Sequence, residues 1–239
     1  MENKNLLSGL VKNQKLLDMY LRYLHFGRVH YTETNITPQV KTEKIRLLET
    51  AVRHGYRIEN SLIYRLQQEF VRENLSLYLL LEPLATWRYL ATQKLPESET
   101  QLTDVLGNIS SPLARFLMAL NDETPSTYFP IQSLITALIL LQMFQQKDVF
   151  LQKIKWRKNG KVSKLKGLLK DGFTVLSVVK SKKLKYRLAV LLNKAYVLTE
   201  KFAKNKQPTI EILDAVRIFL YSTTQVVFIK KRTITKREL

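Results

Sequence analysis

Few residue patterns in this 239-residue chain have the types and spacing that catalysis requires. Two carboxylates four residues apart on a helix could clamp Mg²⁺ against a diphosphate, because carboxylate oxygens suit this hard cation. The sequence contains no D-x-x-x-D or D-D-x-x-D segment, and Asp148 stands alone near the end of an apolar stretch. It also contains neither G-x-x-x-x-G-K-S/T nor G-x-G-x-x-G, the glycine-rich phosphate loops. No cysteine is present, which excludes disulfides and thiolate metal sites.

Arg115 is the most informative candidate for ligand binding. It lies within the apolar segment 113–117, so an inward-facing guanidinium would need an anionic partner. It would then bind an anion in a pocket; alternatively, it extends along its own stem to the surface. Gln142, Gln145 and Gln146 could line a polar pocket end, or they could belong to the solvated last turns of a helix.

Positive charge is concentrated in the C-terminal part of the chain. The net charge is +19, and residues 147–239 hold 24 Lys and Arg against 6 Asp and Glu. Such a block attracts anionic lipid, nucleic acid or diphosphate groups, although a lysine-rich solvated surface would look the same. We expect the basic surface to include Lys153, Lys155, Arg157, Lys158, Lys161, Lys182, Lys183, Lys185, Lys230, Lys231 and Arg232.

The stretch Leu134 to Gln146 predicts the helix around which these residues are arranged. Its apolar residues fill nearly the whole helix circumference, which is typical of a helix inside a bundle or a bilayer. The apolar run is too short for a bilayer, which needs roughly 20 residues. The sequence therefore predicts the central helix of a soluble helical bundle.

Amphipathic patterns predict further helices before this central one. Leu6 to Leu24 has helical spacing, and His25 to Pro38 should break it. Ile58 to Leu81 reads as one long helix that Pro83 breaks or kinks, and Pro112 to Leu120 as a small separate helix.

The C-terminal part also reads as helical. Leu184 to Phe202 has a helical pattern, and Pro208 should open the last helix. The basic tail 229–237 is expected at the periphery. With no internal repeat or low-complexity linker, the simplest interpretation is one all-α domain over 1–239, with 147–239 as its basic part.

Targeting signals are not evident. The segment 1–20 carries Glu2 and Asp18 and lacks a continuous apolar core, so it does not resemble a secretory signal. The expected location is the cytoplasm, with peripheral attachment to a membrane as an option and the mitochondrion as an alternative.

Two segments resemble the squalene/phytoene synthase family. Ile109 to Leu120 is similar to the family segment in which small residues run into V-G-R-L-hydrophobic, and Thr136 to Gln146 is similar to its A-L-Q-L-T-N-F-L-Q-D helix. Lys230 to Lys236 resembles a basic R-R-P-T-L segment near the end of some members. The order and spacing fit over most of the chain, so the resemblance implies the all-α isoprenoid synthase fold.

The aspartates of that family are missing here. Its second aspartate motif would begin at Gln146 with a partner at Phe150, and its first should lie near Phe26 to Glu33, which holds one acid. Without these carboxylates, Mg²⁺ has no clamp from which to neutralise a leaving diphosphate. The resemblance thus implies the fold and argues against the activity, as in non-catalytic branches such as mitochondrial complex I assembly factors.

The leading hypothesis is a non-catalytic protein without a cofactor, which binds an anionic membrane surface or an isoprenoid-like lipid and could assemble with a protein partner. One alternative is nucleic-acid binding through the basic part, with Tyr186 and Tyr196 stacking on bases, although no known recognition motif is present. The other is an active head-to-head prenyl transferase with atypical Mg²⁺ ligands, Asp148 with Glu33 or Glu73.

Overall fold

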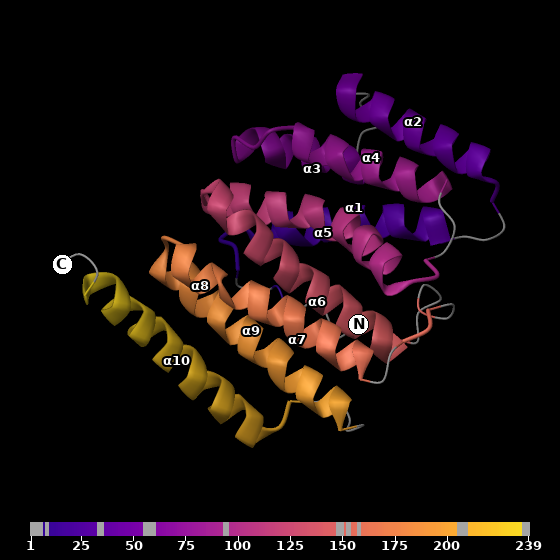
Figure 1. Ribbon diagram of the computed structural model, residues 1–239. Helices are drawn as coiled ribbons and strands as arrows, with labels where there is room; N and C mark the ends of the chain where they lie inside the picture. The colour runs from indigo at the N-terminus through magenta and orange to yellow at the C-terminus, as the bar shows by residue number, and fades with distance from the viewer. Residues whose placement is uncertain are drawn as a thin grey trace. The chain divides into compact units, whose positions relative to one another are not determined.

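The computed structural model describes residues 7, 10–32, 36–54, 61–92, 96–146, 151, 154–156, 159–204 and 210–235. Within these residues the chain is helical and has no strand, which confirms the all-α prediction (Figure 1). The chain divides into two compact units. We call residues 11–95 the N-terminal unit and residues 1–10 with 96–239 the C-terminal unit. The single domain expected over 1–239 stays a prediction.

The N-terminal unit contains four helices: α1 (Gln14–Thr32), α2 (Pro38–His54), α3 (Leu62–Arg72) and α4 (Tyr78–Thr92). Helix α1 packs against α3 and α4, and α2 packs against α4. The core consists of apolar and aromatic side chains that are almost fully shielded from water, among them Leu16, Leu17, Tyr20, Tyr23, Leu66, Phe70, Leu80 and Leu84.

The helix boundaries in this unit correct three predictions. Helix α1 begins at Gln14, where the Asn13 side chain accepts a hydrogen bond from the Leu16 amide, and not at Leu6. It continues through Gly27, where a break was expected, because an interior glycine costs a helix only about 1 kcal/mol. The helix predicted over 58–81 is two helices, since Asn74 adopts the left-handed conformation (φ 53°) just after α3 ends.

Pro83 lies inside α4 and does not end a helix there. Proline has no N–H, so the Leu79 carbonyl four residues earlier lacks its usual intrahelical donor. The Tyr20 hydroxyl donates to this carbonyl at 2.8 Å, and the Tyr23 hydroxyl donates to the next one, of Leu80, at 2.7 Å. Burial raises the pKa of both tyrosines above the ordinary value, so both hydroxyls remain protonated donors.

We predict that Tyr20→Phe destabilises the protein by about 1–3 kcal/mol, because it leaves a buried carbonyl without a donor. Denaturant-induced unfolding of the full chain measures this. Tyr78→Phe is the matched control, since Tyr78 is 61% exposed and should tolerate the change. Equal unfolding midpoints for the wild type and Tyr20→Phe would contradict the role given to this hydroxyl.

Helix α6 is the centre of the C-terminal unit. It packs against α5 on one side and α7 on the other, and it also contacts α9 (Figure 1). Leu134, Ile135, Ala137 and Leu140 are at most 2% exposed, which confirms a central helix over the predicted stretch. The elements of this unit are α5 (Glu99–Asn121), the 3₁₀ turn η2 (Pro125–Thr127), α6 (Tyr128–Gln146), α7 (Gly160–Phe173), α8 (Val175–Val178), α9 (Lys182–Ala203) and α10 (Ile212–Thr235).

Pro112 is a second proline inside a helix, so the separate helix predicted from this residue is wrong and α5 is continuous. Polar side chains of α6 meet α5 just before this proline. Gln132 donates to the Gly107 carbonyl at 2.9 Å, and the hydroxyls of Ser110 and Thr136 hydrogen-bond at 2.8 Å. These contacts, with the hydrogen bond from the Tyr128 hydroxyl of α6 to Ser111 of α5, fix how the two helices lie against each other.

The stretch Pro125–Gln145 spans 21 residues and is long and apolar enough to cross a membrane, which the shorter run considered in the sequence was not. A core helix has the same length and composition. Most of this stretch is α6, whose neighbours α5 and α7 cover it, and 56% of its most apolar window is buried. Its length and composition therefore leave the predicted location open.

The close approach of α6 and α7 gives a matched pair of predictions. A Cβ added at Gly172 would lie 3.3 Å from the Leu134 Cβ and 3.1 Å from a Leu192 methyl, whereas one added at Gly167 meets nothing within 4 Å. We expect Gly167→Ala to stabilise the protein by up to about 1 kcal/mol through helix propensity. Gly172→Ala should lose this gain to crowding. Thermal unfolding measures both, and equal shifts would contradict close packing at Gly172.

Candidate functional site

Helix α10 is held to α9 by an ion-pair cluster at its start. Lys201 Nζ lies 2.7 Å from Asp214 Oδ2 and 2.9 Å from Glu211 Oε1, and the Lys201 side chain is only 11% exposed. The hydrogen bond from Lys201, with one from the Glu211 amide, lowers the pKa of Asp214, and the Asp214 carboxylate in turn raises the pKa of Lys201. Both groups are therefore charged at neutral pH.

About two turns further along, buried polar groups continue this contact. The Asn193 side-chain amide on α9 donates to Ser222 Oγ at 3.1 Å and to Gln225 Oε1 at 2.9 Å, and Ser222 donates to the Ile218 carbonyl at 2.6 Å. Asn193 is 6% exposed and Ser222 is fully buried. The inner face of α10 is thus partly polar, and among its described side chains it includes the buried apolar Ile218.

The opposite face of α10 is apolar and exposed. Leu213 is 81% exposed, Phe219 58%, Leu220 55% and Val216 52%. Leu213, Val216 and Leu220 recur at i, i+3 and i+7, which places them along one stripe of the helix. We call these four residues the outer face. In the part of α10 whose side chains are described, polar groups thus face α9 and an apolar stripe faces away from it, unlike in an ordinary surface helix.

Exposed lysines lie on the neighbouring elements of the same unit. Of the predicted basic residues, Lys155, Lys161, Lys182 and Lys183 are exposed and Lys185 is half-buried. Lys153, Arg157 and Lys158 lie outside the described residues, as do the side chains of Lys230, Lys231 and Arg232, whose backbone belongs to α10. Helix α9, which carries three of these lysines, lies between α7 and α10 (Figure 1).

Lys161 also has a local role. Its Nζ lies 5.5 Å from the ring centroid of Phe144 and 6.0 Å from that of Trp156, and these two rings meet edge to face. Phe202 stacks on Phe144. This lysine therefore covers an aromatic cluster that joins α6 to α9, beyond any contribution to the basic surface.

The predicted ligand pocket was assigned to Arg115, Gln142, Gln145 and Gln146. Arg115 is exposed on α5, where its guanidinium lies 5.0 Å from the Tyr128 ring centroid. Gln142 is half-buried and Gln145 exposed on α6, while the Gln146 side chain lies outside the described part. A pocket lined by these residues stays a prediction.

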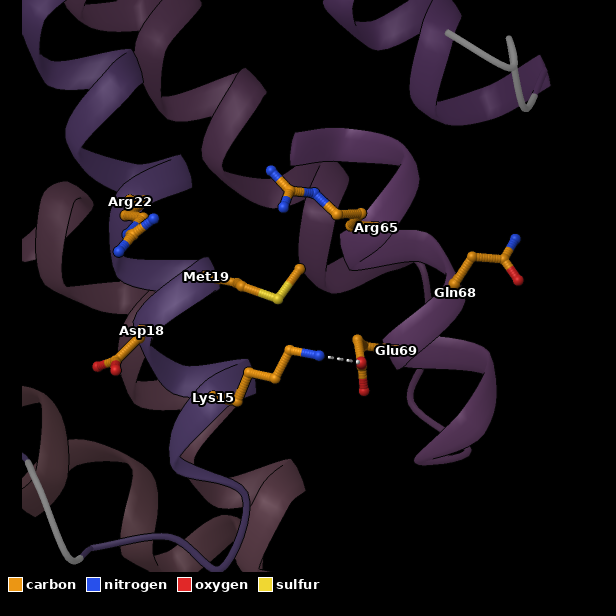
Figure 2. A pocket seen from close by; sticks show the side chains of 7 residues that line it. All are labelled: Lys15, Asp18, Met19, Arg22, Arg65, Gln68 and Glu69. Carbon is orange, nitrogen blue, oxygen red and sulfur yellow. Dashed lines mark hydrogen bonds and ion pairs between the residues drawn. The ribbon is translucent and has the colours of Figure 1, made fainter. Parts of the chain in front are cut away.

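A different hollow, absent from the sequence prediction, lies between α1 and α3 in the N-terminal unit. This groove has a volume of about 530 Å³ (Figure 2). The residues that matter for its chemistry are Lys15, Asp18, Met19 and Arg22 on α1 and Arg65 and Glu69 on α3. On each helix they recur at spacings of three and four, a periodic signal in the sequence that could have identified two facing charged stripes.

In the described ranges, no group of three or more His, Cys, Asp or Glu side chains is placed to hold a metal ion. Glu73, one of the Mg²⁺ ligands of the enzyme alternative, is exposed and accepts a hydrogen bond from Asn13 at 2.7 Å. Asp148 and Glu33 lie outside the described residues.

Comparison with protein-family models, curated proteins and solved structures finds no match for this chain. The resemblance to squalene/phytoene synthases therefore stays a prediction.

The pKa of Asp214 leads to a prediction for the attachment of α10. This pKa is lower in the folded protein than its ordinary value of 3.8. The ionised Asp214 carboxylate therefore stabilises the folded protein above pH 3.8, and this contribution is lost as the pH falls through the lowered pKa. Asp214→Asn should therefore reduce the thermal midpoint at neutral pH, and the difference should shrink below pH 3.8. Asp104→Asn, an exposed control on α5, should change little. A pH-independent difference would argue against the Lys201–Asp214 pair.

Proposed function

We propose that this chain is a non-catalytic helical protein that binds anionic membrane surfaces through the outer face of α10 and basic residues of the same unit. The observation that carries the proposal is the reversed polarity of α10. A helix that lies in a membrane interface buries its apolar side among lipid chains and keeps its charged side near the headgroups. Leu213, Val216, Phe219 and Leu220 offer such a side, and α9 and the ion pairs hold it outward.

Charge supports an anionic lipid surface as the occupant of this face. Residues 147–239 carry 24 Lys and Arg against 6 Asp and Glu, and each basic residue near an anionic surface contributes on the order of 1 kcal/mol. A second copy of the chain would cover the apolar stripe but would bring two strongly positive parts together. The phosphates of a nucleic acid would neutralise the lysine charges but would leave the apolar stripe of α10 exposed to water.

The predicted isoprenoid synthase-like fold without its aspartates is part of the same proposal. The two segments on which the resemblance depends, Ile109 to Leu120 and Thr136 to Gln146, lie on α5 and α6, which pack side by side. That adjacency is what a shared helical core requires. A protein with this core and no Mg²⁺ clamp would keep the affinity for lipid surfaces and not the chemistry.

Liposome flotation tests the proposal. We expect the wild type to float with vesicles of phosphatidylcholine and phosphatidylserine at low salt, and to bind phosphatidylcholine alone more weakly. The double variant Leu213→Ser/Phe219→Ser should lose most of this binding, because it removes apolar area without adding charge. Val71→Ser is the control, since Val71 is an equally exposed apolar residue (71%) on α3.

Flotation of the double variant at the wild-type level, or no flotation of the wild type at low salt, would contradict the proposal. If the wild type sediments as a dimer and the double variant sediments as a monomer, the outer face is the contact with a second copy. Salt-sensitive retention of nucleic acid on filters, unchanged in the double variant, would favour the nucleic-acid alternative.

A further inference from the structure

The α1–α3 groove presents two arginines from different helices to one cavity. On α1, Lys15, Met19 and Arg22 lie at i, i+4 and i+7, so they share a face, and α3 packs directly against this helix. Figure 2 shows Arg22 and Arg65 toward one end of the groove, with Met19 between that end and the Lys15–Glu69 pair. Met19 is 9% exposed, so an apolar side chain separates the two ends.

The acidic residues of the groove already have partners. Glu69 pairs with Lys15 at 3.5 Å through one oxygen and with Arg72 through the other, and its side chain is 12% exposed. Asp18 accepts a hydrogen bond from the Gln14 side chain at 3.1 Å. The charge of Glu69 is therefore largely neutralised by Lys15 and Arg72, whereas Asp18, whose printed partner is a neutral amide, keeps its negative charge.

The two arginines differ in this respect. Within the described part of the chain, the guanidinium groups of Arg22 and Arg65 make no hydrogen bond or ion pair, so their ten N–H donors are available to a ligand. Two cations over one cavity repel each other unless an anion lies between them. The groove volume of about 530 Å³ is in the range of small-molecule sites.

We propose that this groove binds a phosphate group between Arg22 and Arg65. A guanidinium forms paired hydrogen bonds to carboxylate and phosphate alike, but one guanidinium occupies both oxygens of a carboxylate. A tetrahedral phosphate still has free oxygens for a second guanidinium that approaches from the other helix. The rest of a phosphate monoester would lie over Met19 toward the Lys15–Glu69 pair. The phosphate could be that of a soluble metabolite or of a lipid headgroup.

Isothermal titration calorimetry of the full chain with inorganic phosphate and with glycerol 3-phosphate tests this. We expect saturable one-site binding that Arg22→Gln and Arg65→Gln each weaken about tenfold or more, because each removes charge-assisted hydrogen bonds. Lys44→Gln is the control: it makes the same change in charge on α2, outside the groove. Arg22→Lys and Arg65→Lys keep the positive charge but lose the paired N–H donors of the guanidinium, so these variants should show intermediate affinity. Circular dichroism verifies that each variant folds.

A second arm uses vesicles of phosphatidylcholine with phosphatidic acid, which carries the same monoester group. If the soluble phosphates do not bind but Arg22→Gln and Arg65→Gln reduce flotation on these vesicles, the ligand is a headgroup. If both arms are unaffected by these substitutions, or if Lys44→Gln weakens binding equally, the proposal is wrong. Leu213→Ser/Phe219→Ser should leave binding of soluble phosphate intact, so failure at α10 and failure at the groove are distinguishable.

Discussion

The constraint on which the architecture depends is the need of every buried backbone carbonyl for a donor. Pro83 deprives α4 of one amide, and the missing hydrogen bond is supplied from another helix by Tyr20, with Tyr23 beside it. Near Pro112 in α5, Gln132 of α6 donates to the Gly107 carbonyl, although this is not the carbonyl that Pro112 leaves without its intrahelical donor. In each unit, an internal proline thus coincides with a directional contact to a neighbouring helix. Apolar packing alone would leave the rotation of these helices less well defined.

That contact also determines which side of α1 is available for binding. The tyrosines face α4, while Lys15, Met19 and Arg22 line the groove against α3. A rotation of α1 that brought Arg22 toward carboxylates elsewhere would remove both hydroxyls from their carbonyls. The cost of leaving the buried Leu79 carbonyl without a donor, about 1–3 kcal/mol, is larger than what an exposed ion pair contributes. The open arginines are therefore a consequence of how α1 is anchored.

The sequence predicts the parts of this structure that depend on local periodicity. Helix α6 could be predicted because its residues are apolar around nearly the whole circumference, which is typical of a helix inside a bundle or a bilayer, and its apolar run looked too short for a bilayer. The continuation of α4 and α5 through Pro83 and Pro112 could not be predicted in this way. At Pro83 the lost amide is replaced by the Tyr20 hydroxyl, which is remote in sequence and therefore invisible to local periodicity. The Arg22–Arg65 groove was missed for the same reason: periodicity places each arginine on a face but does not say which faces meet.

Helix α10 shows why an exposed apolar stripe can persist on a folded protein. Rolling the helix to bury Leu213 and Phe219 would separate Lys201 from Asp214 and Asn193 from Ser222. Each separation leaves a largely buried polar or charged group without its partner, which costs about 1–3 kcal/mol or more. Fully burying one leucine or phenylalanine side chain gains about 1.5–3 kcal/mol. The two sides of this balance are close, and the directional contacts specify one orientation. An apolar surface kept outward by such contacts can be covered only from outside the unit, which is what a membrane interface would do.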